Sequence, residues 1–137
     1  MYRKITEALN EGGKDGDVTM AILTGTGKFY SAGNDLAAMA AMAGSDPKAA
    51  AETGRASLHD FQCAFINFPK PLLAAVNGPA IGIMVTTLAL ADIVWASDTA
   101  TFSAPFSGTA QTPEGCATLL FPQIFGPSLA NEMVSNY

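Results

Sequence analysis

The sequence predicts an α/β fold in which the strands pair largely in parallel, and two observations indicate it. Apolar runs of strand length alternate along the chain with segments of helical pattern. The runs at residues 18–23 and 72–76 carry apolar side chains at most consecutive positions, not only at alternate ones. Strands that are apolar on both faces are typical of a parallel sheet covered by helices.

The first expected elements follow from the spacing of apolar residues and glycines. A short helix is expected over residues 1–10, closed by Gly12 and Gly13. A strand over residues 18–23 then leads into a glycine-punctuated loop over residues 24–34.

A short alanine-rich helix is expected from Asp35 onward. Residues 45–47, Ser-Asp-Pro, are a typical start for the long helix that should run to about Asn67. The prolines of residues 68–71 end it and direct the chain into a strand over residues 72–76. The remaining expected elements are, in order, an apolar helix that follows residues 77–79 and ends near Ala91, strands at 93–96 and 101–103, a helix from residues 112–113, and a last helix over 128–136.

Composition excludes several classes of protein. The 137 residues include 7 Lys+Arg and 12 Asp+Glu, which gives a net charge of −5. With 49% hydrophobic and 14% charged residues, the chain does not have the composition of a disordered protein. No basic cluster is present, so we expect no binding of nucleic acid. The shortage of charge predicts that much of the surface is covered, by a partner subunit or by further sequence.

The cysteines and the single histidine predict neither a disulfide framework nor a metal site. Cys63 and Cys116 have apolar neighbours and are expected to be reduced, buried thiols, as in an intracellular compartment. With His59 they cannot build an ordinary zinc site, and His59 is expected to be structural or at the surface. The longest apolar stretch, residues 79–91, is too short to span a bilayer, and no targeting signal is visible.

The loop at residues 24–35 is glycine-rich but does not fit a nucleotide-binding motif. Ile22 and Phe29 stand where a phosphate-binding P-loop needs Gly and Ser or Thr, and Tyr30 stands where a dinucleotide fingerprint needs Gly. What remains is a strand-to-helix loop in which Gly33 allows a close backbone approach. Its amides could hold a negative oxygen, although a simple turn is the commoner explanation for one such loop.

A second strand-to-helix turn, at residues 77–83, repeats this pattern. Two turns that each offer a free amide are what an oxyanion hole requires, because two donors can converge on one oxygen. The pair of turns therefore predicts such a site better than either turn does alone.

Glu114 is the candidate proton-transfer group. It lies in residues 111–116, Gln-Thr-Pro-Glu-Gly-Cys. A glutamate in the first turn of a helix could be there simply because the helix dipole favours it. Apolar residues flank this segment, however, and desolvation would raise the pKa of a carboxyl group held among them.

In this order, the motifs resemble the enoyl-CoA hydratase/isomerase (crotonase) superfamily. The matching text is Leu23-Thr24-Gly25, residues 29–36 (FYSAGNDL), 69–72 (PKPL), 76–82 (VNGPAIG), 91–98 (ADIVWASD) and 100–102 (ATF). Residues 31–35 with 113–116 most resemble the peroxisomal Δ3,Δ2-enoyl-CoA isomerases and the related chromodomain-Y-like proteins. The resemblance implies a spiral of repeated ββα units. It also implies a single core domain over residues 1–137, truncated at both ends, without the family's first strand and C-terminal helices.

The resemblance also implies roles for individual residues. The backbone N–H groups of Asn34 and Ile83 would form the oxyanion hole, and Glu114 would be the catalytic base. No metal and no separate cofactor is implied, because coenzyme A is part of the substrate. The residues expected to line the substrate and coenzyme A path are Ser31, Ala32, Gly33, Asn34, Asp35, Leu36 and Gly82.

The reaction class follows from two positions. In the hydratases of the family two glutamates are catalytic, and their places are held here by Thr86 and Phe106. Moving a double bond from C3 to C2 needs only one base, so the resemblance implies an enoyl-CoA isomerase of fatty acid β-oxidation. A dienoyl-CoA isomerase would need an additional acidic residue, and no convincing one is found.

The rival hypothesis is a non-catalytic module that binds acyl-CoA or another protein, as in the chromodomain-Y-like proteins or an inactive isoform. By resemblance alone, the protein is expected to be a homo-oligomer, a trimer in the family, and to be peroxisomal or mitochondrial.

Overall fold

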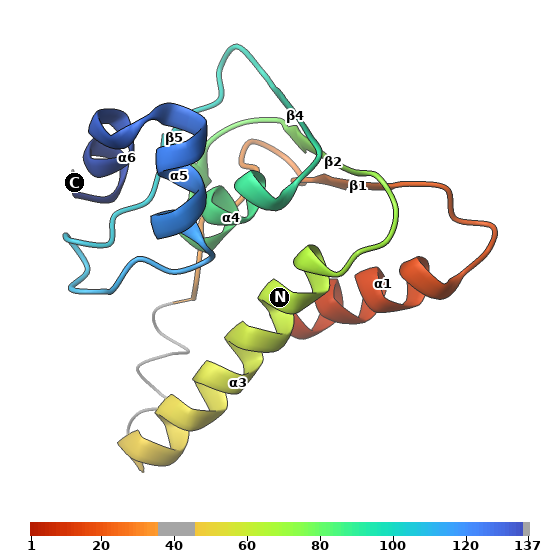
Figure 1. Ribbon diagram of the computed structural model, residues 1–137, viewed down its shortest axis with the longest axis horizontal. Coiled ribbons are helices and arrows are strands. Elements are labelled where there is room, and N and C mark those ends of the chain that lie inside the picture. The colour runs from red at the N-terminus through yellow and green to blue at the C-terminus, as the bar shows by residue number, and fades with distance from the viewer. Residues whose placement is uncertain (36–45, 136–137) are drawn as a thin grey trace. The chain divides into compact units, whose positions relative to one another are not determined.

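The computed structural model describes residues 1–35 and 46–135, which fall into two compact units. The helical unit consists of Met1–Ala21 and Asn34–Pro71, and the sheet unit of Ile22–Gly33 and Leu72–Tyr137. Each unit is described by itself (Figure 1). The short helix expected after Asp35 lies outside the described residues, and the single-domain expectation stays a prediction.

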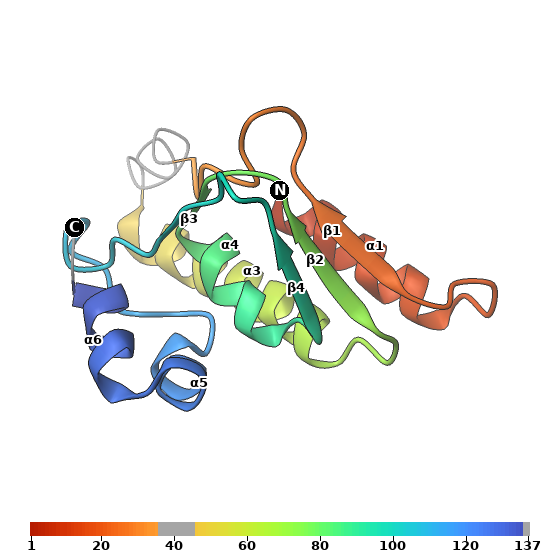
Figure 2. The same cartoon turned by 90° about the horizontal axis from the view of Figure 1, so that it is seen from above.

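The helical unit is built on two packed helices, α1 (Tyr2–Lys14) and α3 (Pro47–Ile66). They lie side by side in both views (Figures 1 and 2). As expected, α3 starts after Asp46, whose carboxylate accepts hydrogen bonds from the Lys48 and Ala49 amides at 3.0 and 3.1 Å. Fully buried Phe61 stacks on Tyr2 with ring centroids 4.5 Å apart, which anchors one helix on the other.

The expected end of α1 before Gly12 and Gly13 is wrong, because the helix continues through both glycines to Lys14. The Lys70 ammonium group donates to the Gly12 carbonyl at 2.7 Å and to the Asp15 carbonyl, so it satisfies acceptors in the last turn. A methyl group at Gly13 would lie 3.0 Å from Pro69 Cδ. The glycine therefore allows close packing here instead of ending the helix.

The sheet unit contains three neighbouring strands in the order β1 (Ala21–Thr24), β2 (Leu72–Val76), β4 (Ile93–Ala96) (Figure 2). The expected parallel pairing is confirmed for β2 and β4, with Leu73 opposite Ile93. The Asp92 carboxylate accepts a hydrogen bond from the Leu72 amide at 2.8 Å, which holds the starts of both strands together.

A second, two-stranded sheet joins β3 (Ala80–Ile81) and β5 (Phe102–Ser103), again in parallel. The strand β3 was not expected from the sequence. The apolar helix expected to end near Ala91 is present as α4 (Ile83–Thr86), which continues as the 3₁₀-helix η1 (Thr87–Leu90).

The last two helices, α5 (Ala117–Phe125) and α6 (Pro127–Ser135), pack against each other (Figure 1). A helix start at residues 112–113 is wrong. Gly115 and Cys116 have φ angles of 66° and 62°, so the chain is left-handed there and α5 begins only at Ala117. The last expected helix is confirmed within the described residues.

The strand β4 differs from the expectation that strands are covered on both faces. Ile93, Val94 and Trp95 are 46%, 41% and 66% exposed in the chain by itself.

The cysteines were expected to be buried thiols. Cys63 and Cys116 are free thiols but are only half-buried. Within residues 1–35 and 46–135, no helix combines the length and apolar character needed to cross a bilayer.

Tyr30 is a buried tyrosine of the sheet unit with an unfavourable environment for its hydroxyl group. The residue is 7% exposed, and within the described part of the chain its hydroxyl has no hydrogen-bond partner. Desolvation raises the pKa of Tyr30 from 10.0 to about 12. The neutral hydroxyl already costs stability, and its ionised form would cost more.

We predict that Tyr30→Phe changes the pH dependence of stability. The pKa of Tyr30 is higher in the folded state than in the unfolded state. The stability that depends on the neutral hydroxyl is therefore fully present below pH 10 and is lost as pH rises toward 12. In this window the parent should lose up to about 1.4 kcal/mol per pH unit relative to the variant. At neutral pH the variant should be as stable as the parent, or more stable by about 1 kcal/mol. Urea unfolding of both proteins between pH 8 and 11 measures this; parallel curves would contradict it.

Candidate active site

The first glycine loop and the second strand-to-helix turn lie against each other in the sheet unit. Ser31 forms a parallel β-bridge with Ala80, and the Ile81 amide donates to the Ser31 carbonyl at 2.9 Å. The Tyr30 and Ser31 amides both donate to the Pro79 carbonyl, at 3.0 and 3.3 Å. The two turns singled out from the sequence are therefore joined by backbone hydrogen bonds.

Gly33 and Gly82 are where the two turns meet. Their φ angles are +84° and +67°, values that residues with a side chain rarely adopt. A methyl group built on Gly82 would lie 3.7 Å from the Gly33 Cα atom, and one on Gly33 would lie 3.1 Å from the Ile81 carbonyl oxygen. The expectation that Gly33 allows a close backbone approach is confirmed, and the approach is to β3.

The Ile83 amide begins α4 directly after this contact. The Gly82 amide is engaged, because it donates to the Ser103 carbonyl at 2.8 Å. Among the hydrogen bonds of the described residues, none starts from the Ile83 amide. Such an N–H group in the first turn of a helix has no partner within the helix and can donate to a ligand.

Glu114 is half-buried and lies beside α4. The fully buried Thr86 hydroxyl donates to the Ile83 carbonyl at 2.9 Å and lies 3.4 Å from Glu114 Oε1. One side chain therefore contacts both the carboxylate and the residue whose amide is the candidate oxyanion donor. This link was not expected from the sequence, where Thr86 stood only for a missing glutamate.

Gly115 permits this arrangement. A methyl group there would overlap the Thr86 side chain, so the segment can approach α4 only with glycine at this position. The Glu114 carbonyl accepts a hydrogen bond from the Ala117 amide at 3.2 Å. Glu114 thus precedes α5 and is not in its first turn, so the capping explanation for this residue is not supported.

The other sequence-predicted site residues are distributed over both units. Ser31 is half-buried and its Oγ accepts a hydrogen bond from the Gly33 amide at 3.1 Å, whereas Ala32 is exposed. Asn34 and Asp35 belong to the helical unit, where the Asn34 carboxamide accepts from the Tyr2 hydroxyl at 2.5 Å.

Leu36 lies outside the described residues. That the Asn34 amide joins the Ile83 amide in one oxyanion hole stays a prediction. Phe106, which by resemblance stands where a hydratase would carry its second glutamate, is 3% exposed, and its side chain has no group that could transfer a proton.

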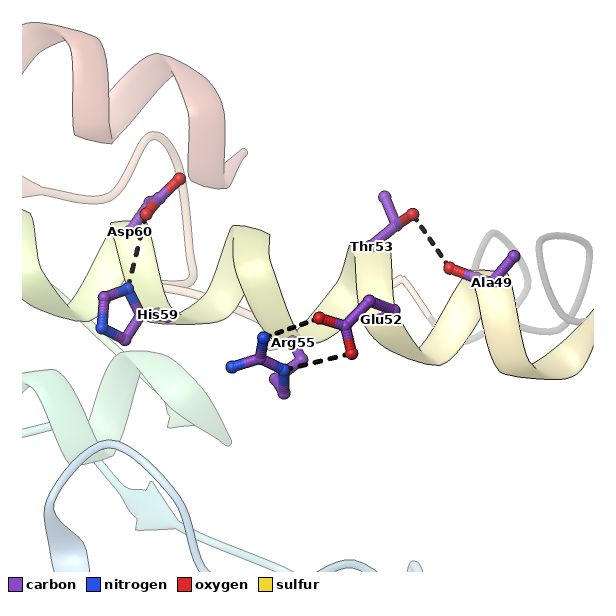
Figure 3. A network of polar contacts seen from close by, with 6 residues as sticks. All are labelled: Ala49, Glu52, Thr53, Arg55, His59 and Asp60. Carbon is purple, nitrogen blue, oxygen red and sulfur yellow. Dashed lines mark hydrogen bonds and ion pairs between the residues drawn. The ribbon is translucent and has the colours of Figure 1, made fainter.

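The polar residues of α3 form an exposed helix surface (Figure 3). Arg55 pairs with Glu52 at 2.6 Å, and the His59 ring lies 3.4 Å from Asp60. Exposed pairs of this kind contribute little stability and suggest no chemistry. Among the described side chains, no cluster of three or more His, Cys, Asp or Glu residues is arranged to hold a metal ion.

The sheet unit also has an apolar cavity of about 400 Å³. Val85, Leu88, Phe121, Phe125 and Met133 are among its lining residues. Val85 is adjacent in sequence to Thr86, but none of the sequence-predicted site residues lines the cavity.

Comparison with known proteins connects this geometry to a family. Residues 1–136 match the family described as enoyl-CoA hydratase/isomerase. Over 134 residues the chain is 47% identical to enoyl-CoA delta isomerase 2 from Homo sapiens and 50% identical to the peroxisomal enoyl-CoA delta isomerase 3 from Mus musculus. It is 37% identical, also over 134 residues, to chromodomain Y-like protein 2 from Homo sapiens.

A solved enoyl-CoA hydratase/isomerase from Pseudoalteromonas atlantica shares the fold, with a TM-score of 0.82 and 32% identity. The chain therefore belongs to the enoyl-CoA hydratase/isomerase family, and the resemblance stated from its motifs is confirmed. The match covers 96% of this chain and 49% of the solved one. For the three curated relatives the coverage is 98% of this chain, and 34%, 42% and 26% of the relatives.

We predict that Gly115→Ala destabilises the protein more than Gly126→Ala does. Both glycines have positive φ angles, 66° and 78°, so alanine should cost about 1–3 kcal/mol at either position. A methyl group at Gly126 would meet nothing within 4 Å, whereas one at Gly115 would overlap Thr86. The overlap should add at least about 1 kcal/mol. Denaturant unfolding of the two variants measures this difference; equal losses would show that Gly115 is not in close contact with α4.

Proposed function

We propose that this chain carries the catalytic core of an enoyl-CoA isomerase, which moves a cis or trans C3 double bond of a fatty acyl-CoA to trans-C2. The observation that carries the proposal is the position of Glu114, half-buried and 3.4 Å from the Thr86 hydroxyl, beside the turn that presents the Ile83 amide. The identity of 47–50% to two delta isomerases supports the same reaction.

In this proposal Glu114 moves one proton. Its carboxylate takes a proton from C2 of the substrate, and the electron pair of that C–H bond delocalises into the thioester to give an enolate conjugated with the C3–C4 double bond. The carboxylic acid then returns the proton to C4, which leaves the double bond between C2 and C3. One carboxylate is sufficient, because it ends the cycle in the form in which it began.

The enolate oxygen carries the negative charge that appears during the reaction. We assign its stabilisation to the backbone N–H groups of Ile83 and Asn34, which would donate to the thioester oxygen. Gly33 and Gly82 serve this arrangement because each immediately precedes one of the two donors. Ser31, Ala32, Asp35 and Leu36 would border the path of coenzyme A, which arrives as part of the substrate.

Hydration is disfavoured by the two positions that resemble those of the hydratase glutamates. The Thr86 hydroxyl is already engaged with the Ile83 carbonyl at 2.9 Å, and Phe106 has no ionisable group. A hydratase needs one group to activate water and another to handle the proton at the α-carbon. Of these three positions, only that of Glu114 carries a carboxylate that could transfer a proton.

The biological setting belongs to the proposal as well. The reaction would serve the β-oxidation of unsaturated fatty acids, in peroxisomes or mitochondria; the Mus musculus relative is named as peroxisomal. The exposed β4 side chains support assembly into a homo-oligomer, a trimer by family resemblance, because exposed apolar patches mark interaction surfaces. A non-catalytic acyl-CoA-binding or protein-interaction module, as the identity to chromodomain Y-like protein 2 would allow, is the alternative.

We predict that Glu114→Gln lowers kcat for isomerisation about 10²- to 10⁴-fold, because the amide keeps the shape of the side chain but cannot accept the proton. Glu132→Gln is the matched control: it removes the same charge from an exposed position of α6 and should leave kcat unchanged. Steady-state assays with trans-3-enoyl-CoA measure both. A Glu114→Gln variant as active as the control would exclude Glu114 as the base and favour the non-catalytic module.

We also predict that the protein isomerises trans-3-enoyl-CoA faster than it hydrates trans-2-enoyl-CoA. The two substrates are supplied separately, and the products are separated by chromatography. Faster hydration would replace the isomerase assignment by a hydratase one.

A further inference from the structure

We propose that Asn77 is a positioning residue for this site: its carboxamide fixes the path of the first glycine loop and thereby where Gly33 meets Gly82. The inference rests on the proposed function for its catalytic consequence. Its structural part concerns the sheet unit alone, because Asn77 and both glycines lie within that unit.

The Asn77 side chain hydrogen-bonds three backbone groups of one loop. Its Oδ1 atom accepts from the Gly25 amide at 2.9 Å. Its Nδ2 atom donates to the Gly27 carbonyl at 2.9 Å and lies 3.5 Å from the Phe29 carbonyl oxygen, at the limit of a hydrogen bond. Only a carboxamide has both an acceptor and two donors in this geometry.

The loop and the turn are packed too closely for side chains at their contact. A methyl group at Gly25 would lie 2.7 Å from Asn77 Oδ1, and one at Gly78 would overlap the Lys28 carbonyl group. Asn77 therefore hydrogen-bonds a loop that close contacts already hold against the turn.

The contact continues residue by residue toward the candidate site. Beyond Phe29, the Tyr30 and Ser31 amides donate to the Pro79 carbonyl at 3.0 and 3.3 Å, and the Ile81 amide donates to the Ser31 carbonyl at 2.9 Å. Gly33 then packs on Ile81 and Gly82. Asn77 begins this series of contacts and the Gly33–Gly82 contact ends it, so a shift of the loop at Asn77 should be transmitted to Gly33.

Thr24 offers a matched control. Its hydroxyl donates to the Ala75 carbonyl at 2.8 Å, so a side-chain hydrogen bond also joins β1 to β2. Thr24 ends β1, however, and its bond lies before the loop begins. Losing this bond should weaken the β1–β2 contact without changing the path of the loop.

The test compares Asn77→Asp with Thr24→Val. The introduced carboxylate keeps an acceptor for the Gly25 amide but replaces the Nδ2 donor by an oxygen that faces the Gly27 carbonyl. We expect amide hydrogen exchange at Tyr30, Ser31 and Ile81 to become at least about tenfold faster, as bonds beyond the altered contact open more often. We expect kcat for trans-3-enoyl-CoA to fall about 10- to 100-fold while KM changes less than about threefold, because misplaced donors act mainly on the transition state.

Thr24→Val should leave both the exchange of these three amides and kcat within about twofold of the parent. The inference would be overturned if Asn77→Asp changed amide hydrogen exchange and kcat no more than Thr24→Val does. A fall in kcat with unchanged exchange would also overturn it, because Asn77 would then act in some other way than through the loop.

A second measurement needs no variant and decides the case if Asn77→Asp does not fold. In the parent, the amides of Gly25, Tyr30, Ser31 and Ile81 should exchange with similar opening free energies, because the series of contacts opens as one unit. A Gly25 amide that opens independently of the other three would contradict the inference. If the parent shows no isomerase activity, the proposed function fails, and these exchange data still decide whether Asn77 fixes the loop.

Discussion

The sheet unit depends on backbone segments that approach each other more closely than side chains would allow. Gly33 meets β3, Gly82 turns the chain into α4, and Gly115 lies against Thr86. A Cβ atom would lie 3.1 Å from the Ile81 carbonyl oxygen at Gly33 and would overlap the Thr86 side chain at Gly115, while at Gly82 the positive φ angle is what favours glycine. This constraint explains why the candidate site is assembled from turns, and why the oxyanion donors that we propose are peptide N–H groups.

In the proposed function, the choice of reaction would depend on a few side chains. Backbone amides could stabilise an enolate oxygen, but they transfer no proton. The side chains beside α4 are a threonine whose hydroxyl donates to the Ile83 carbonyl and a glutamate from the segment before α5. In the proposal, this pair would favour proton transfer by a single base.

The apolar surface of the chain follows from the same architecture. Buried β2 supplies the centre of the sheet, while its partner β4 exposes Ile93, Val94 and Trp95. The low charge content of the sequence indicated that much of the surface would be covered, and the exposed apolar side chains of β4 are consistent with that expectation. The chain spans about half the length of the solved relative, so in that relative further sequence adjoins the matched region.

The sequence by itself determined the α/β class, the bounds of β2, the start of α3 at its Asp46 cap, and the two glycine turns that lie against each other. These features depend on local capping chemistry, apolar runs and motif spacing. Other features appear only in the tertiary structure. Lys70 donates to a carbonyl in the last turn of α1, which continues through two glycines. Left-handed residues delay the start of α5, and the Thr86 hydroxyl lies beside Glu114. Such outcomes depend on atoms distant along the chain, whose approach no local pattern records.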